Sequence, residues 1–246
     1  MSVLTLEAVG KRYGDATVLD DVSLDFTAGH ITAIIGRSGC GKSTLLKICN
    51  GLVAPDTGLA RVFGQALDYA NLPLLRRRLG YAVQGTGLFP HLSARQNITL
   101  LASLEGWSQE RIEQRVTELL QLTHLQQSQL HKFPHQLSGG QQQRVGLCRA
   151  MMLRPEILLL DEPFAAIDPI TRQDIHRQLL ELHRAEPTTA VLVTNDMREA
   201  MRLADHIVIM DEGRIRCSQS TAALQQDNPG VDPEDLLQSL MSQATP

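Results

Sequence analysis

Residues 31–43, with the sequence ITAIIGRSGCGKS, decide the fold class of this chain. The stretch begins with a short β-branched run typical of a buried strand, passes into a glycine-rich turn and continues into the helical pattern KSTLLKICNGL. Gly36–Ser43 match the pattern G-x-x-x-x-G-K-[ST] of the loop that binds nucleotide phosphates. A surface turn with an unrelated lysine is the alternative, but the flanking strand and helix favour a site for a nucleoside triphosphate.

The residue types in this loop suit phosphate chemistry. Glycines allow a tight turn in which successive backbone N–H groups converge on phosphate oxygens, and the following helix adds its dipole. Lys42 supplies a positive charge toward the β- and γ-phosphates, and the hydroxyl of Ser43 is a candidate ligand of Mg²⁺. The candidate ATP-binding residues of this stretch are Gly36, Ser38, Gly39, Cys40, Gly41, Lys42, Ser43 and Thr44.

The composition argues against several classes of protein. The chain has 246 residues, a net charge of -4 and 4% aromatic residues, so it lacks the basic field and stacking surface typical of nucleic-acid-binding proteins. Its four cysteines form no C-x-x-C pair, which favours a reducing cytosol over a disulfide framework or a zinc site. The N-terminus does not resemble a signal peptide, and no apolar run is long enough to span a bilayer. At a membrane, another chain is expected to supply the membrane part.

The order of strand and helix patterns predicts an α/β fold with a parallel-cored, mixed sheet. Residues 3–30 alternate apolar and polar side chains, which indicates antiparallel strands. After the first helix, helix-like segments with polar loops are expected through about residue 150, and further buried strands are expected in EILLLDEP, TAVLVTND and HIVIMDEGRI. In the tail, Asp232 is expected to cap a helix that has Pro233 at its first position.

We therefore expect a single domain over residues 1–246 that has three parts. Residues 1–85 and 150–225 are expected to form a catalytic α/β core with an antiparallel N-terminal β subdomain. Residues 86–149 are expected to form an inserted α-helical subdomain, because they are rich in Gln, Leu and His and lack a long strand pattern. Residues 226–246 are expected to be a short tail.

A second chemical motif lies in ILLLDEP, residues 157–163. Four apolar residues indicate a buried strand, and Asp161 follows at its carboxyl end, where ligand sites of α/β proteins form. An aspartate at this place can hold Mg²⁺ through water, and the next residue, Glu162, can polarise an attacking water as a general base. An ordinary turn at a strand end is the alternative, but the combination of this motif with the phosphate loop favours a site for Mg²⁺ and a general base.

The stretch LSGGQQQR, residues 137–144, decides between families of phosphate-loop proteins. Two glycines after a serine permit close backbone approach, and a helix that begins there offers its N-terminus to an anion. With this LSGGQ signature, the phosphate loop and the D-E-P strand in this order, the chain resembles the ATP-binding cassette (ABC) family over about residues 2–225. The matching signature residues, expected to bind ATP, are Ser138, Gly139, Gly140 and Gln141.

The resemblance implies roles for further residues. Tyr13 matches the aromatic residue that stacks on adenine, although a core tyrosine is the alternative. Gln84 matches a glutamine that touches Mg²⁺ and relays movement to the helical subdomain, and Asp168 matches a loop that contacts a second subunit. In the family, ATP lies between the phosphate loop of one subunit and the signature of the other. The resemblance thus implies a homodimer or a paired cassette as the active form.

Within the ABC family, the chain resembles the ATPase subunits of bacterial importers. Only 53 residues separate Gln84 from Ser138 (138 − 84 − 1), which leaves no room for the coiled coil of DNA-repair members. GLFPHLSARQNI and DEPFAAIDPITR look like importers of osmoprotectants and other quaternary amines, with polar amino acid importers as the alternative. The resemblance implies a peripheral protein at the cytoplasmic face of the inner membrane, permease subunits that dock near Leu88–Leu92, and a solute-binding protein as an indirect partner. The chain stops at Pro246, so the regulatory domains that often follow in these ATPases are expected to be absent.

Asn195, in the stretch VLVTNDMREA, is the clearest departure from the family pattern. Most members carry a histidine here, which contacts the γ-phosphate and helps to orient Glu162 and the attacking water. An asparagine still donates a hydrogen bond, but it reaches less far and carries no charge near neutral pH. We therefore expect intact ATP binding with slower hydrolysis. The alternatives are normal turnover, or an ATP-gated dimerisation switch that hydrolyses ATP weakly.

Two smaller features complete the sequence-based expectations. Cys40 lies in the phosphate loop beside Lys42 and a helix N-terminus, a setting that can lower a thiol pKa, and its oxidation is expected to block ATP binding. Arg76–Arg78 are expected to form a solvated surface rather than a patch for lipid or nucleic acid.

Overall fold

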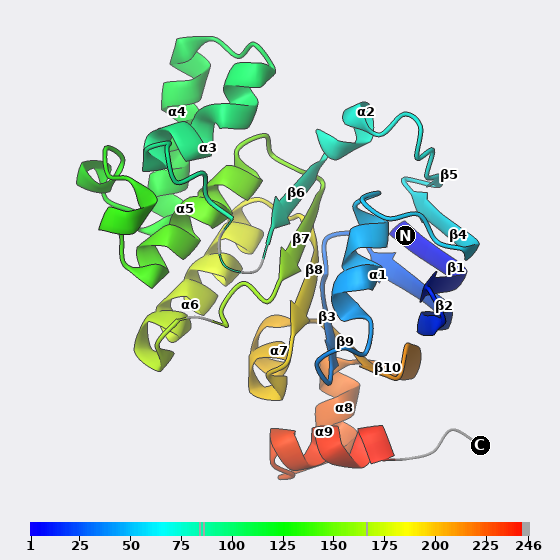
Figure 1. Cartoon of the computed structure of the whole chain (residues 1–246). Helices are drawn as coiled ribbons and strands as arrows, with labels where there is room; N and C mark the ends of the chain where they lie inside the picture. The colour runs from blue at the N-terminus through cyan, green and yellow to red at the C-terminus, as the bar shows by residue number, and fades with distance from the viewer. Residues whose placement is uncertain (84, 86, 166, 243–246) are drawn as a thin grey trace. The chain divides into compact units, whose positions relative to one another are not determined.

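The computed structural model describes residues 1–83, 85, 87–165 and 167–242 (Figure 1). The chain forms two compact units. The first unit contains residues 1–74 and 189–246, and the second contains residues 75–188. Among the described residues, no helix is both long enough and apolar enough to cross a membrane.

The first unit contains an antiparallel sheet that is built mainly from the N-terminal hairpin. Its strand order is β2-β1-β4-β5, and every neighbouring pair is antiparallel. Alternate side chains, such as Leu4, Leu6, Val22 and Leu24, are buried, because a two-residue period places them on one face. This confirms the predicted antiparallel strands. The bounds are β1 (Ser2–Tyr13), β2 (Ala16–Thr27), β4 (Thr57–Val62) and β5 (Gln65–Ala66).

A second sheet of the first unit carries the phosphate loop. In the order β10-β9-β3-β8, strand β3 pairs in parallel with both β8 and β9, and β10 is antiparallel to β9. All residues of β3 and β8 are buried, which is typical of parallel strands in the interior of a sheet. The mixed sheet confirms the predicted fold class. The strands are β3 (Ile31–Gly36), β8 (Thr189–Thr194), β9 (His206–Asp211) and β10 (Arg214–Ser220).

The described residues of the first unit also form the helices α1 (Lys42–Cys49), α7 (Met197–Leu203), α8 (Thr221–Asp227) and α9 (Pro233–Ser242). The last of these confirms the predicted tail helix. Asp232 accepts a hydrogen bond from the N–H of Glu234 at 2.9 Å, and it also pairs with Arg198 of α7 at 2.9 Å. Leu236 is 2% exposed, so the tail helix packs on its own unit instead of projecting into solvent.

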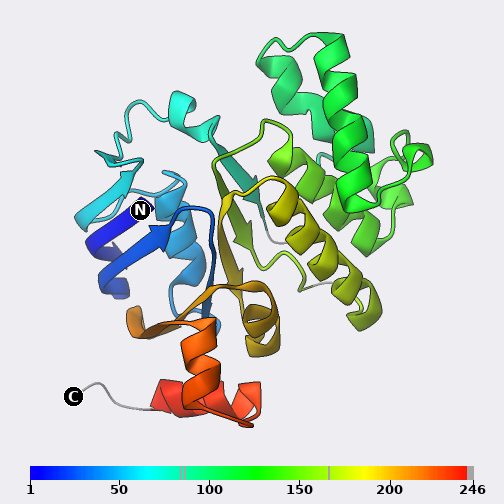
Figure 2. The same ribbon diagram turned by 180° about the vertical axis from the view of Figure 1, so that it is seen from behind.

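The second unit is mainly helical and contains one parallel pair of strands, β6 (Leu79–Ala82) and β7 (Ile157–Asp161). Helices α3, α4, α5 and α6 pack against one another, and α5 also packs on β6. Figure 2 shows these helices from behind. The helical content agrees with the prediction for this part of the chain, while the exact subdomain limits stay a prediction. The helices are α2 (Pro73–Arg76), α3 (Ala94–Leu104), α4 (Gln109–Thr123), α5 (Gly139–Met151) and α6 (Pro169–Ala185), with short 3₁₀ turns at Gln127–Gln129 and Pro134–Gln136.

The expectation of helix-like segments and loops from the first helix to residue 150 is wrong at three places. β4, β5 and β6 are strands of six, two and four residues. β5 and β6 are too short to show a periodic pattern, and β4 and β6 pair with strands remote in sequence, β1 and β7 respectively. Arg76–Arg78 are exposed as expected, and Arg77 pairs with Glu105 at 2.7 Å.

Candidate nucleotide-binding site

The phosphate loop of the first unit has a backbone that requires glycine at several positions. Gly39 and Gly41 have φ angles of +84° and +105°, which side-chain-bearing residues rarely adopt. A Cβ on Gly36 would lie 2.0 Å from the carbonyl oxygen of Met210, and one on Gly41 would lie 2.6 Å from the carbonyl oxygen of Val18. The loop is therefore packed closely between β2 and β9. Glycine is required at these positions because a side chain would clash with neighbouring backbone or because the φ angle is positive.

Lys42 lies inside the loop that it follows. The residue is 4% exposed, and its Nζ donates hydrogen bonds to the carbonyl oxygens of Gly36 at 2.7 Å and Arg37 at 2.9 Å. These contacts hold an ammonium group within the turn, where its charge favours an anion. Ser43 and Thr44 follow in the first turn of α1.

The turn between β9 and β10 is hydrogen-bonded to the phosphate loop. The N–H of Gly213 donates to the carbonyl oxygen of Cys40 at 3.1 Å, and the N–H of Asp20 in β2 donates to the carbonyl oxygen of Gly213 at 2.9 Å. A Cβ on Gly213 would lie 2.7 Å from the carbonyl oxygen of Val18. Sequence reasoning missed this support, because the contact joins residues more than 170 positions apart.

The environment of Cys40 overturns one sequence-based argument. Its side chain is buried, and burial raises the pKa of the Cys40 thiol above its ordinary value although Lys42 acts in the opposite direction. The expected lowering of the Cys40 pKa is therefore wrong, since desolvation of the thiolate outweighs the opposing effect of Lys42. The Cys40 thiol is therefore buried and protonated near neutral pH. Because oxidation of a cysteine requires the thiolate, the chemical argument for selective oxidation of Cys40 no longer holds.

Asn195 lies at the end of β8, level with the start of the phosphate loop. Ile35 of β3 pairs with Thr194 of β8, so Gly36 and Asn195 leave two adjacent parallel strands at the same edge of the sheet. Asn195 is exposed, and the next residue, Asp196, accepts hydrogen bonds from the N–H groups of Arg198 and Glu199 as the N-cap of α7. This cap fixes the chain direction immediately after the asparagine.

Tyr13 occupies the tip of the β1–β2 hairpin, where it pairs with Ala16. Its side chain is 50% exposed, which excludes the alternative of a core tyrosine. The Nζ of Lys11 lies 5.6 Å from the ring centroid, a cation–π distance. Because Val18 of the same hairpin contacts Gly41, this ring belongs to the strand pair that borders the phosphate loop.

In the second unit, the two predicted carboxylates end the strand β7. Asp161 is 6% exposed, whereas Glu162 is partly exposed and has a φ of +44°, so the chain turns sharply between the strand and Pro163. Burial raises the pKa of the neighbouring Tyr81 to about 12, and the charge of Asp161 adds to this shift. Gln84, the predicted glutamine two residues after β6, lies outside the described residues.

The signature residues begin helix α5 with a capping box. The Oγ of Ser138 accepts from the N–H of Gln141 at 3.3 Å, and the N–H of Ser138 donates to the Gln141 side chain at 3.1 Å. Gly139 is exposed, and a Cβ on Gly140 would lie 2.4 Å from Cγ2 of Thr171 in α6. The second glycine is thus required because α5 and α6 approach closely at their N-terminal ends.

Asp168 is the N-cap of α6 and accepts from the N–H of Thr171 at 3.0 Å. This hydrogen bond, with that of the Thr171 side chain, holds the pKa of the Asp168 carboxyl below its ordinary value. Two predicted site residues, Ser138 and Asp168, therefore cap the N-termini of two helices that contact each other.

The segment predicted to dock a membrane partner is partly exposed. The Phe89 side chain is 43% exposed, so at least one large apolar residue of the segment Leu88–Leu92 lies at the surface. Its backbone is held by the fully buried Asn97, whose Oδ1 accepts from the Phe89 N–H at 2.8 Å and whose Nδ2 donates to the Phe89 carbonyl at 3.1 Å. Arg149 of α5 donates to the carbonyl oxygen of Gly87 at 2.8 Å. Sequence reasoning missed Asn97 and Arg149, because neither forms a recognisable motif with the segment.

The donor set suits Mg²⁺, the metal that the motifs imply. This ion takes oxygen ligands and is usually held by one or two protein groups together with nucleotide phosphates. The Ser43 hydroxyl and the Asp161 carboxylate offer such oxygens. Over the described part of the chain, no group of three or more His, Cys, Asp or Glu residues could hold a metal by itself. A metal at either residue would thus depend on phosphate oxygens for its remaining ligands.

The strand, glycine-rich loop and helix of the first unit define a phosphate-loop nucleotide-binding protein of the α/β class. The family model for ABC transporters matches residues 19–165, and the chain belongs to this family. The resemblance inferred from the phosphate loop, the LSGGQ signature and the D-E-P strand is thereby confirmed.

The chain is similar to ATP-binding proteins of uptake and transport systems. The chain is 45% identical to the glycine betaine uptake system ATP-binding protein YehX of Escherichia coli (strain K12), over 90% of this chain and 69% of that protein. It is 42% identical to the glycine betaine/carnitine/choline transport ATP-binding protein OpuCA of Bacillus subtilis (strain 168), over 87% of this chain and 56% of that protein. The chain therefore spans little more than half the length of OpuCA.

Among solved structures, the fold is similar to that of the dimeric ATP-binding cassette MJ0796 in a post-hydrolysis state with ADP and Pi. The TM-score is 0.81 at 31% sequence identity, with 89% of this chain and 98% of that chain covered. The likeness bears out the expected ABC-type fold.

Proposed function

We propose that this chain is the ATP-binding and ATP-hydrolysing subunit of an ABC importer. The observation that carries the proposal is the presence, in one chain, of a phosphate loop with an internal lysine and of a signature helix that begins at a capped Ser138. In the proposed cycle, two copies or a paired cassette enclose ATP between the phosphate loop of one and the signature of the other. Dimer closure and reopening drive a membrane partner.

Each predicted site residue has a defined task in this proposal. The loop amides, Lys42 and Thr44 bind the phosphates, and Tyr13 stacks on the adenine. Ser43, Asp161 and Gln84 hold Mg²⁺, which supplies charge neutralisation at the phosphates when it is bound. Glu162 takes a proton from the attacking water, and Asn195 donates a hydrogen bond near the γ-phosphate. Ser138, Gly139, Gly140, Gln141 and Asp168 act toward the partner subunit.

The proposed substrate is an osmoprotectant or a related small solute. YehX and OpuCA, whose names describe uptake of glycine betaine and transport of glycine betaine, carnitine and choline, support this substrate class. The partners would be permease subunits that dock near the exposed Phe89, with a solute-binding protein acting through them. The protein would then work at the cytoplasmic face of the inner membrane.

The first experiment compares wild type with Glu162→Gln in ATP binding and in Mg²⁺-dependent turnover. We expect unchanged ATP affinity and a loss of turnover of about 10²–10⁴-fold, the usual contribution of a general base. Co-expression with candidate permeases, followed by uptake of radiolabelled glycine betaine and choline, identifies the transported class. An unchanged turnover in Glu162→Gln would contradict the assigned role of this residue.

A second function, an ATP-gated dimerisation switch, is favoured by one observation. Asn195 stands level with the phosphate loop where the family pattern has a histidine, and an asparagine provides weaker support for developing charge. A switch would dimerise with ATP but turn it over very slowly even with a permease present. If ATP turnover of the wild-type protein rises when the permease is added, the result supports the transporter subunit and contradicts the dimerisation switch.

A further inference from the structure

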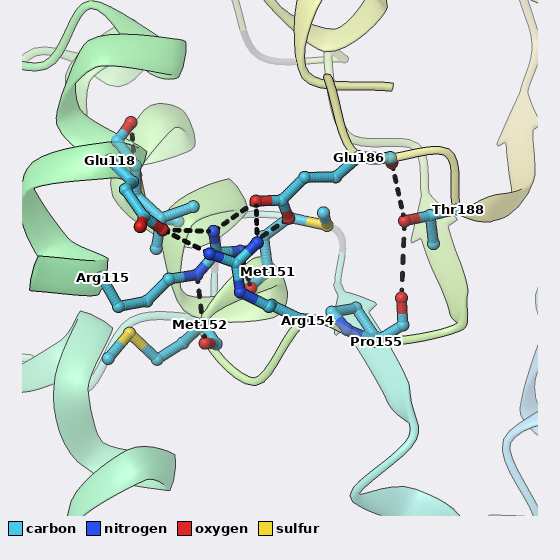
Figure 3. Close-up of polar contacts among 10 residues, drawn as sticks. Arg115, Glu118, Met151, Met152, Arg154, Pro155, Glu186 and Thr188 are labelled. Atoms are coloured by element: carbon cyan, nitrogen blue, oxygen red, sulfur yellow. Dashed lines mark hydrogen bonds and ion pairs between the residues drawn. The ribbon is translucent and has the colours of Figure 1, made fainter. Parts of the chain in front are cut away.

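Arg115 of α4 is a buried cation at the centre of a polar cluster in the second unit (Figure 3). Its side chain is 2% exposed, and each of its five N–H groups has a hydrogen-bond acceptor. Nη1 donates to Glu118 at 3.2 Å and to Oε1 of Glu186, and Nη2 donates to Oε2 of Glu186 at 2.8 Å. Nη2 also donates to the carbonyl oxygen of Met151 at 2.7 Å, and Nε donates to that of Met152 at 3.4 Å.

A second guanidinium closes the cluster from the solvent side. Arg154 is 51% exposed and donates to Glu186 at 2.6 Å and to Glu118 at 2.6 Å. The two carboxylates are thus bridged twice, once by the buried arginine and once by the exposed one. Thr188 anchors the same turn, because its hydroxyl donates to the carbonyl oxygen of Glu186 at 3.0 Å.

The cluster joins the C-terminal ends of two particular helices. Met151 is the last residue of α5 and Met152 is its C-cap, while Glu186 is the C-cap of α6. The N-termini of the same two helices are capped by Ser138 and Asp168. At those N-terminal ends, Gly140 of α5 packs against Thr171 of α6.

We propose that Arg115 is a positioning residue for the partner-facing ends of α5 and α6. Arg115 donates hydrogen bonds to residues at the C-terminal ends of both helices. These bonds fix the position of the two helices relative to each other along their axes, and thereby the placement of Ser138 beside Asp168. The inference rests on the proposed function, in which these two N-termini meet the partner subunit across ATP. Arg115 itself touches neither site residue and acts through the helices.

Helix length explains why a contact at one end controls the other. At a rise of about 1.5 Å per residue, α5 and α6 are roughly 20 and 25 Å long and behave as rods. The close approach of Gly140 to Thr171 serves as a pivot, so a small displacement at the C-termini changes the tilt of both N-terminal turns. A planar guanidinium with five directed donors defines this geometry, whereas an ammonium with three rotatable donors does not.

The experiment separates positioning from simple stabilisation. Arg115→Lys and the double variant Arg115→Met/Glu186→Met are prepared in the Glu162→Gln background, which is expected to accumulate the ATP-bound dimer. The double variant removes the buried charges together, so it keeps the fold without an unpaired ion. Two quantities are measured: the ATP affinity of the monomer and the ATP-dependent dimer dissociation constant by analytical ultracentrifugation.

We expect the dimer dissociation constant to rise at least about tenfold in both variants, equivalent to about 1.4 kcal/mol, with monomer ATP affinity changed less than about twofold. Arg95→Gln serves as the matched control, because it breaks an ion pair with Glu113 that links α3 to α4 and leaves the cluster intact. The ATP-dependent dimer dissociation constant of Arg95→Gln should equal that of the parent Glu162→Gln protein.

The outcomes distinguish this inference from the proposed function. If the parent Glu162→Gln protein does not dimerise with ATP, the proposed function fails first. If the parent dimerises and both folded variants dimerise equally well, Arg115 only stabilises the fold and the positioning role is overturned. A weaker dimer in Arg95→Gln, equal to that in Arg115→Lys, would also overturn it.

Discussion

Two helix N-termini in this chain carry glycine-rich motifs, and they differ in how they are capped. Helix α1 begins after Gly41 in a left-handed conformation, and no side chain among the described residues caps it. Helix α5 begins at Ser138, whose capping box with Gln141 satisfies backbone groups from within the motif. At α1 the cap residue is a glycine without a side chain, whereas at α5 the serine cap satisfies the N–H of Gln141 from within the motif.

The difference has a physical consequence. Backbone N–H groups at a helix start favour phosphate, and the buried Lys42 adds charge to the same place. The phosphate-loop terminus therefore gains most of its interactions when nucleotide binds. The signature terminus is formed in the free chain, and an anion there must compete with the serine cap. Under the proposed function, we therefore expect one monomer to bind nucleotide at α1 first, and α5 to engage the nucleotide only in the dimer.

The largest expected effect comes from Lys42→Met, which removes the charge from the α1 side and keeps the apolar stem. ATP affinity should fall by roughly 100-fold, in line with the loss of about 3 kcal/mol from hydrogen bonds to a charged group. Isothermal titration with ATP measures this. Lys47→Met is the matched control, because Lys47 is an exposed residue of the same helix. An equal loss of affinity in both variants would remove Lys42 from the site.

Asn195→His adds a longer, chargeable donor to the same edge of the sheet. If Asn195 limits hydrolysis, turnover should increase by about 10–100-fold, since one well-placed donor is worth on the order of 10²–10³ in rate. ATP affinity should change little. Steady-state phosphate release at saturating ATP and Mg²⁺ is the measurement. The absence of any gain would mean that the asparagine supports normal turnover.

Ser138→Ala and Ser93→Ala test the capped side with a matched pair. Both serines form capping boxes, Ser138 with Gln141 at α5 and Ser93 with Gln96 at α3. Each substitution should lower the free energy of unfolding by about 1 kcal/mol. Only Ser138→Ala should also weaken the ATP-dependent dimer, measured in the Glu162→Gln background. Equal dimerisation of the two variants would make the signature serine a structural cap alone.

The last comparison concerns a fully buried thiol on each helix, Cys49 of α1 and Cys148 of α5. Burial raises their pKa values from 9.0 to about 12 and about 11, respectively. The unfolded thiols ionise near pH 9 while the folded ones stay protonated. Stability should therefore be fully present below pH 9 and decline above it, by up to about 1.4 kcal/mol per pH unit for each thiol, until the folded pKa is reached.

Urea unfolding between pH 8 and pH 10.5 measures this decline. Cys49→Ala and Cys148→Ala should each reduce the slope of stability against pH. A slope that is unchanged in both variants would assign the alkaline loss of stability to other groups.

Much of the nucleotide site could be predicted because its motifs are local. Gly36–Ser43 lie within one strand–turn–helix unit, and the S-x-x-Q spacing of Ser138 and Gln141 encodes a capping box directly. Asp161 and Asn195 follow apolar runs that mark buried strands, so their place at strand ends follows from the pattern. The failures were short strands, such as β6, and the pKa of Cys40, where burial outweighs the charge visible in the sequence.

The sequence by itself determined the family, the strand that enters the phosphate loop, the loop glycines and the helix starts, because each depends on neighbouring residues and on backbone sterics. Tertiary structure alone decided that Gly213 supports Cys40, that Asn97 holds Phe89 and that Arg115 joins the ends of α5 and α6. Partners in these contacts are separated by between 8 and more than 170 positions, and no local pattern pairs them. Burial then determines their weight, since a polar group removed from water must find its hydrogen bonds within the fold.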